Sequence, residues 1–195
     1  MTKQKWGRDP IVTPQLKMHC FSFDELPAQN IPQGYELKAL EDGDEGKYVE
    51  ITTEAFGGER NFEVDVIKHA GYYPGGTYFI YSGDEAVATS TAIIDLSAGN
   101  KEGYLHMVAA LKGHKGKGLG FEISLACLHL MKYEGMTGCT LKTDDFRLPA
   151  IAIYLKLGFL PEVTDDSHYE RWSKVLTELN KKNLISFVMG QILNN

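Results

Sequence analysis

The chain has 195 residues, of which 43% are hydrophobic and 24% charged, and its formal net charge at neutral pH is −6. This length predicts one domain that buries roughly 70% of its unfolded surface, and the composition excludes disordered, collagen-like and low-complexity classes. The acidic balance argues against nucleic acid as the main partner, because neutralising phosphates requires a concentrated basic surface.

Nothing in the chain predicts a membrane or metal partner. No stretch reaches the ~18 to 20 uninterrupted apolar residues of a membrane span, and residues 1–8 lack the apolar core of a secretory signal. Cys20, Cys127 and Cys139 are odd in number and lack metal-type spacing, and no histidine belongs to a metal motif. We therefore expect a cytoplasmic protein with reduced thiols, no membrane partner and no metal.

The N-terminal segment, residues 1–34, holds most of the prolines and predicts a lead-in that wraps over the domain, with an edge strand within 16–23. Alternation of apolar and polar residues then predicts a strand at 35–40. A helix is expected at 44–56, with Asp42 and Glu45 placed as a capping box, and a second short helix ends at Gly71.

Strand signals dominate the middle of the chain. Residues 77–81 and 86–94 predict a hairpin, and another strand is expected at 104–111. The glycine-rich segment 112–120 then opens a helix that runs through residue 133. A buried strand at 139–142, a helix that starts with Pro149 and ends at Gly158, and a strand at 159–160 follow.

The C-terminal segment, residues 174–195, carries an apolar stripe at Val175, Leu179, Phe187 and Ile192. It predicts a helix that docks either on the same domain, residues 35–173, or on a second subunit of a homodimer. Hairpin strands first and strand–helix–strand units later predict an α/β (α+β) fold with a mixed, mostly antiparallel central sheet and helices on both faces.

The glycine-rich loop predicts an anion site. Glycines between a strand and a helix let backbone N–H groups converge on a ligand at the helix N-terminus, and Lys115 and Lys117 add positive potential. The loop is not a Walker loop, because Leu119 and Gly120 follow Gly118 where Lys and Ser/Thr are needed. It also lacks the third glycine of the dinucleotide fingerprint.

Two segments resemble the signatures of the GNAT N-acetyltransferase superfamily. Lys115, Gly118 and Gly120 fit its acyl-CoA loop, Q/R-x-x-G-x-G/A, with Lys in place of Gln or Arg. The second signature, N-x-x-A-x-x-x-Y-x-x-x-G-F, is matched by the following residues, with Arg147 in place of Asn: Ala150, Tyr154, Gly158 and Phe159. The resemblance covers residues 35–159.

This resemblance implies a GNAT-like fold with a splayed acyl-CoA-binding strand pair, and acetyl-CoA as co-substrate. The splayed strand corresponds to Val108, Ala109 and Ala110, whose free amides would bind the thioester carbonyl and the oxyanion. The implied cofactor-binding residues in the loop are Lys115, Gly116, Lys117, Gly118, Leu119 and Gly120. Tyr154 matches the tyrosine that protonates the leaving thiolate.

Attack by an amine requires a base, since a primary amine has a pKa near 10 and is protonated at neutral pH. His106 is the candidate, and period-two alternation places it on one strand face with Tyr104, Val108 and Ala110. Glu54 on the first helix is the alternative base.

The sequence thus predicts an N-acetyltransferase that acts on the amine of a small molecule or a peptide. Two other interpretations stay open: a non-catalytic CoA-binding regulatory module, suggested by Lys115 and Arg147, and a purine-nucleotide binder that uses the same loop.

Overall fold

The computed structural model describes residues 13–96, 99 and 101–193. Pro10 and the rest of residues 1–12 lie outside these ranges, as does the side chain of Ile192. Within them, no helix is both long and apolar enough to cross a bilayer.

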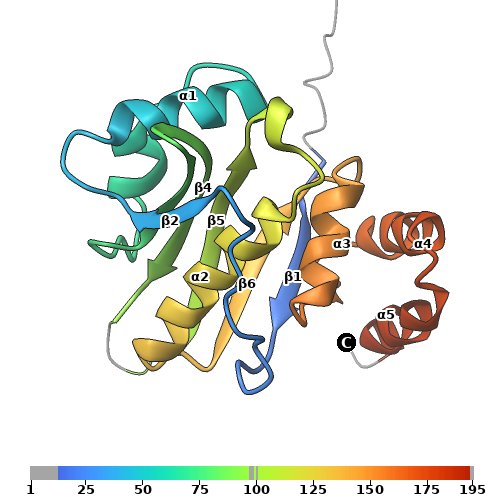
Figure 1. Ribbon diagram of the computed structural model, residues 1–195. Coiled ribbons are helices and arrows are strands. Elements are labelled where there is room, and N and C mark those ends of the chain that lie inside the picture. The colour runs from blue at the N-terminus through green and yellow to red at the C-terminus, as the bar shows by residue number, and fades with distance from the viewer. Residues whose placement is uncertain (1–12, 97–98, 100, 194–195) are drawn as a thin grey trace, which may run out of the picture.

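A seven-stranded sheet runs through the molecule in the order β2-β3-β4-β5-β6-β1-β7 (Figure 1). All neighbouring strands are antiparallel except β5 and β6, which pair in parallel. The mixed, mostly antiparallel sheet predicted from the sequence is therefore confirmed. In sheet order the strands are β2 Glu36–Ala39, β3 Thr77–Ser82, β4 Glu85–Ile94, β5 Glu102–Ala110, β6 Gly138–Thr143, β1 Leu16–Cys20 and β7 Leu160–Glu162.

Strand β1 lies inside the sheet, so its expected position at an edge is wrong. It pairs with β6 on one side and β7 on the other, and Leu16, Met18 and Cys20 are buried in the main core. The prolines of the lead-in suggested an edge, but none of them falls within the strand. Both sides of β1 can therefore donate to a ladder.

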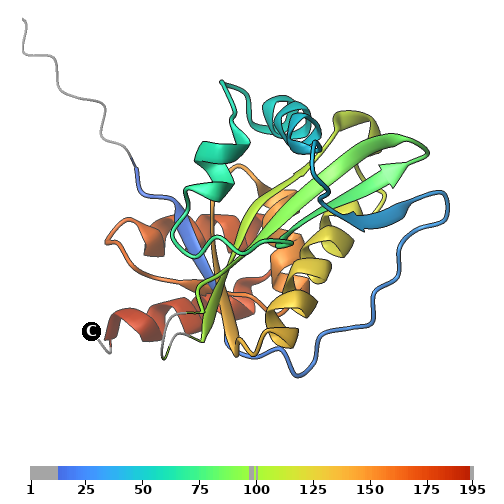
Figure 2. The same ribbon diagram turned by 90° about the vertical axis from the view of Figure 1, so that its left-hand side faces the viewer.

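Helices cover both faces of the sheet. In Figure 2, α1 (Glu45–Phe56) and the π-helical turn η1 (Glu63–Ile67) lie on one side of β3, β4 and β5, and α2 (Leu119–Tyr133) lies on the other. Helix α3 (Leu148–Lys156) packs with α2 in the main core. The capping box expected at Asp42 and Glu45 does not form, since Asp44 is the N-cap of α1 and its carboxylate accepts from Lys47 Nζ at 2.6 Å.

The C-terminal segment forms two helices where one was expected. Helix α4 (His168–Glu178) and helix α5 (Ile185–Leu193) are separated by a turn in which Asn180 has φ +55°, a left-handed conformation that interrupts a helix. Trp172 of α4 and Val188 of α5 are fully buried in the main core. The segment thus packs on the same domain, beside β1 and α3 (Figure 1).

Candidate active site

The centre of the site is the gap that opens between β5 and β6. The two strands pair only where Glu102–Tyr104 of β5 lie beside Gly138–Thr140 of β6. Beyond this point β5 continues to Ala110 and β6 to Thr143 with no shared ladder. The expected splayed strand, Val108, Ala109 and Ala110, therefore borders the gap, with the edge that faces β6 left open.

A bulge in β5 changes which side chains share a face. Thr91 of β4 opposes His106, and Thr89 opposes Ala109, so two β5 residues stand opposite one residue of β4. Met107 at this point has φ +52°. His106 therefore shares its face with Tyr104 and Ala109, and the expected alignment with Val108 and Ala110 is wrong. A bulge shifts period-two alternation by one residue.

His106 faces α1 and η1, and its ring is fixed by a backbone contact. Its Nε2 lies 2.9 Å from the carbonyl oxygen of Asp65 in η1. A carbonyl only accepts, so Nε2 carries the hydrogen and Nδ1 keeps the lone pair in the neutral ring. Burial lowers the pKa of His106, the Asp65 carbonyl opposes this shift, and nearby His69 adds to it. The neutral imidazole is therefore the favoured form at neutral pH.

Two further rings accompany His106 on this face. His69 stacks on Tyr104 with centroids 5.7 Å apart, and its ring centroid lies 5.3 Å from that of His106. Sequence reasoning gave His69 no role in the site. No local pattern could have found it, because tertiary packing of the η1 region alone brings it to β5.

Tyr154 approaches the gap from the opposite face. It lies on α3, is 7% exposed, and packs edge-on against Phe159 at 6.0 Å between centroids. Burial raises its pKa, the charge of Arg147 opposes this shift, and Tyr104 adds to it. The phenol is thus protonated at neutral pH.

The glycine-rich loop leads from β5 into α2 and presents free backbone donors. Gly116 and Gly118 have φ +77° and +82°, and Gly118 is the N-cap of α2 with no side-chain cap. Over the described ranges, the N–H groups of residues 116–120 donate no hydrogen bond. Converging free amides at the positive end of a 15-residue helix form an anion site.

Side chains from outside the loop hold it in place. Glu54 Oε1 of α1 accepts from the N–H of Lys112 at 2.6 Å, so the alternative base is engaged by the loop's backbone. Tyr35 Oη lies 2.9 Å from His114 Nδ1, and Lys117 Nζ sits 5.6 Å from the centre of the Tyr35 ring. Sequence reasoning missed Tyr35, which reaches the loop only through the folded path of the lead-in.

The lead-in crosses the outer side of α2 on its way from β1 to β2 (Figure 1). Gln29 Nε2 and Asn30 N donate to Glu122 Oε2 at 2.6 and 2.9 Å. Further along the helix, Lys132 Nζ donates to the carbonyl of Phe23 at 2.7 Å. The first turn of α2, which follows the anion loop, is thus fixed from outside.

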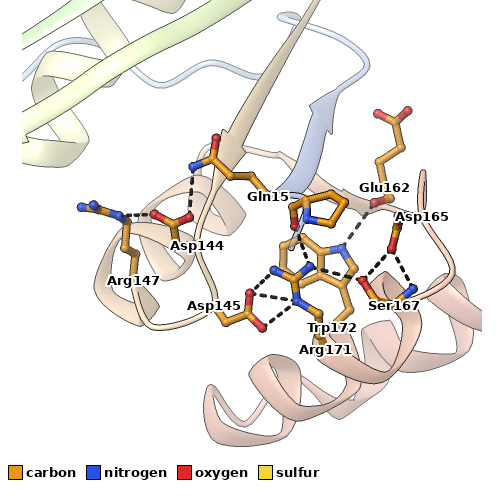
Figure 3. A network of polar contacts seen from close by, with 10 residues as sticks. Gln15, Asp144, Asp145, Arg147, Glu162, Asp165, Ser167, Arg171 and Trp172 are labelled. Carbon is orange, nitrogen blue, oxygen red and sulfur yellow. Dashed lines mark hydrogen bonds and ion pairs between the residues drawn. The ribbon is translucent and has the colours of Figure 1, made fainter. Parts of the chain in front are cut away.

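A polar network ties residues 14–15 and helix α4 to the loop that starts α3 (Figure 3). Arg171 of α4 donates to both carboxylate oxygens of Asp145 and to the carbonyl of Pro14. In the same loop, Asp144 accepts from Gln15 Nε2 at 3.0 Å and from Arg147 Nε at 2.9 Å. These contacts set the position of α3 and therefore of Tyr154.

The described His, Cys, Asp and Glu residues form no metal-ligand group, and the three cysteines are buried. Throughout the described ranges, no group of three His, Cys, Asp or Glu could hold a metal ion. Cys20, Cys127 and Cys139 are free and buried, and burial raises the pKa of each, that of Cys127 to about 12. These thiols are packed in the core as neutral groups.

Comparison with known proteins agrees with this geometry. Residues 46–159, more than half of the chain, match the Acetyltransferase (GNAT) family. The chain is 25% identical over 155 residues to mycothiol acetyltransferase from Saccharomonospora viridis, an alignment that covers 72% of this chain and 51% of that protein.

Solved structures share the fold. A GCN5-related N-acetyltransferase from Sphaerobacter thermophilus superposes with a TM-score of 0.62 at 21% identity, over 77% of this chain and 50% of that one. The ribosomal-protein-S18-alanine N-acetyltransferase from Escherichia coli gives a TM-score of 0.56 at 18% identity, over 66% and 79% of the two chains. The chain spans about half the length of the mycothiol and Sphaerobacter relatives.

Fold and site together define a protein with an anion-binding loop beside a splayed strand pair. The chain belongs to the Acetyltransferase (GNAT) family.

Proposed function

We propose that the chain transfers an acetyl group from acetyl-CoA to the amine of an acceptor by direct attack. The observation that carries this proposal is the open edge of β5, which lies between His106 on one face of the sheet and Tyr154 on the other. An acyl group placed there has a candidate base and a candidate acid on opposite sides.

Acetyl-CoA would bind mainly to backbone donors. The free N–H groups of residues 116–120 suit its diphosphate, and Lys115 and Lys117 add positive potential. Its pantetheine arm would follow the open edge at Val108, Ala109 and Ala110, where the N–H groups of Val108 and Ala110 would face the thioester carbonyl. Donors fixed before reaction stabilise the developing oxyanion without reorganisation.

His106 would accept the proton of the attacking amine at Nδ1, since Nε2 is already bonded to Asp65 O. The nitrogen forms a bond to the acyl carbon, the carbon–sulfur bond breaks, and the electron pair leaves on sulfur. The Asp65 carbonyl then stabilises the imidazolium that forms. The contact between Nε2 and the Asp65 carbonyl supports this role, and the lowered pKa of His106 keeps the ring neutral and able to accept a proton.

Tyr154 would donate its hydroxyl hydrogen to the departing sulfur. Because burial raises the pKa of this phenol, full transfer to a thiolate with a pKa near 8.5 is uphill in the free protein. The hydroxyl would therefore act first as a hydrogen-bond donor, and this hydrogen bond would strengthen as negative charge grows on sulfur.

The acceptor would be the amine of a small molecule or a peptide. The two relatives reported above are named for different molecules, mycothiol in one case and the alanine of ribosomal protein S18 in the other. A cytoplasmic location and a homodimer stay predictions from the sequence.

The test is release of free CoA from acetyl-CoA with a panel of amines, amino acids and peptides, together with calorimetric binding of CoA. We expect CoA binding, and turnover with at least one class of amine. Binding without turnover on any class would favour the non-catalytic regulatory module. Displacement of CoA by ATP at similar concentration would favour the purine-nucleotide binder, and absence of CoA binding would overturn the proposal.

A further inference from the structure

Arg147 occupies an unusual place at the mouth of the gap. It is the N-cap residue of α3, where the family signature has Asn. Its guanidinium carbon lies 4.7 Å from the ring centre of Phe56, the last residue of α1, and 5.1 Å from that of Phe146. The side chain thus reaches from the helix that carries Tyr154 to the helix on the opposite face of the sheet.

Only one nitrogen of this guanidinium is used within the described chain. Nε donates to Asp144 Oδ2 at 2.9 Å, and no hydrogen bond among the described residues involves Nη1 or Nη2. In Figure 3 both terminal nitrogens point away from Asp144 and from the rest of the network. Nη1 and Nη2 of Arg147 thus form a fork of donors that has no acceptor among the residues that the structure describes.

Arg171, drawn in the same figure, is the internal comparison. Its Nε and Nη2 donate to Asp145, and its Nη1 donates to the carbonyl of Pro14. All three nitrogens are used, and the side chain is 17% exposed. Arg171 is therefore a structural arginine. Arg147 has the same charge but is held by two aromatic rings and one carboxylate, with its terminal donors available.

Arg147 lies at the N-terminus of the helix that carries Tyr154. Arg147 and Tyr154 are two turns apart on α3, and the Arg147 charge acts on the Tyr154 hydroxyl. On the other side, α1 leads into η1, whose Asp65 carbonyl holds His106. Arg147 therefore links the helix that carries Tyr154 to the segment that leads to the His106 contact.

We propose that Arg147 binds a carboxylate of the acceptor, so that the substrates are amines that also carry a carboxylate. A planar guanidinium with two free donors matches a carboxylate in a bidentate pair, and stacking on aromatic rings fixes its plane and reduces its hydration. The inference rests on the proposed acetyl transfer and narrows its acceptor. The net charge of −6 gives no long-range attraction for such acceptors, so selection depends on this local contact.

The experiment compares two series of acceptors of increasing chain length, ω-amino carboxylates and the matching ω-amino amides, with acetyl-CoA saturating. Their affinity for CoA-saturated protein is measured in parallel by calorimetry. Wild-type protein should favour the carboxylate over its amide at one or more lengths. Because hydrogen bonds to charged groups are the strong ones, roughly 10- to 100-fold in kcat/KM or in affinity is expected.

Arg147→Gln should remove that preference while leaving the affinity for the amide series and the KM for acetyl-CoA nearly unchanged. Arg147→Lys, which keeps the charge without the fork, should recover only part of it. Equal use or equal binding of carboxylates and amides by wild type, or a preference that survives in Arg147→Gln, would overturn the inference. So would a raised KM for acetyl-CoA in place of a lost preference, since the fork would then contact CoA. If wild type does not bind CoA at all, the proposed function itself fails.

Discussion

The two sides of the gap between β5 and β6 present different chemical groups, backbone donors on one side and side chains on the other. On the side of α2, the groups that can hold a ligand are the free backbone N–H donors of residues 116–120 and those along the open edge of β5. On the side of α1 and η1, they are side chains, His106, His69 and Arg147, each held by contacts with residues distant in sequence. Backbone donors depend little on side-chain identity, whereas the groups on the second side change with each substitution.

Tyr154 would serve both substrates, because it lies on α3 and is proposed to donate to sulfur while the acyl group passes from CoA to the amine. Tyr154→Phe keeps the ring and its packing on Phe159, so stability should fall by about 1 kcal/mol at most. Turnover at saturating acetyl-CoA should fall by roughly 10²- to 10⁴-fold, the usual range for a general acid, with CoA affinity little changed.

Initial rates and calorimetric CoA affinity, measured on the same preparation, check this prediction. Wild-type turnover in the variant would mean that another donor protonates sulfur. Loss of CoA affinity with no separate loss of turnover would make Tyr154 a packing residue of the cofactor side.

His106 tests the acceptor side alone. Burial lowers its pKa, so the neutral base is present above that value and is lost as pH falls through it. The acid limb of the wild-type rate profile should therefore lie below the ordinary imidazole value of about 6.5. His106→Gln should lower turnover at neutral pH by about 10²-fold and flatten this limb, with partial rescue at high pH where more free amine exists.

The readout is kcat/KM for the acceptor across pH, with CoA affinity as the control that should not move. A variant that keeps both the wild-type rate and the wild-type acid limb would return His106 to a structural role.

Substitutions at Gly118 and Lys115 test whether backbone N–H groups or side-chain charge contribute more to CoA affinity. Gly118→Val places a β-branched residue at φ +82°, a left-handed conformation that costs about 1 to 2 kcal/mol for L residues and would displace the neighbouring amides. No heavy atom lies within 4 Å of the added Cβ, so the domain should still fold. CoA affinity should drop about 5- to 30-fold, and Lys115→Ala should cost less.

Calorimetric titration of CoA into both variants, with thermal unfolding as the fold control, decides the order. A larger loss in Lys115→Ala would show that side-chain charge carries the diphosphate site.

The same contrast explains which features could be predicted from the sequence. Short local patterns predict three features, the loop, the start of α3 and the hairpin of β3 and β4. Glycine permits the left-handed conformations of Gly116 and Gly118, and Pro149 has a fixed φ that suits the first turn of a helix. Tyr154 was placed by its register in a long motif. These features depend on neighbours along the chain.

The remaining features depend on contacts between distant segments. The bulge at Met107 changes the face of every later residue in β5, and no glycine or proline marks it. Strand β1 takes an inner position next to the edge strand β7, and both of its neighbours, β6 and β7, come more than 100 residues later. Tyr35, His69 and the free fork of Arg147 likewise acquire their positions only in the folded chain.

We propose that CoA binds in this gap, on backbone donors. The direct measurement is a titration of CoA into uniformly ¹⁵N-labelled protein, followed by the backbone amide resonances. We predict that the amides of Gly116, Gly118 and Gly120, with those of Val108 and Ala110, shift first and saturate together, while those of α4 stay unchanged. Shifts confined to another surface, or no saturable shift in the loop, would contradict the account.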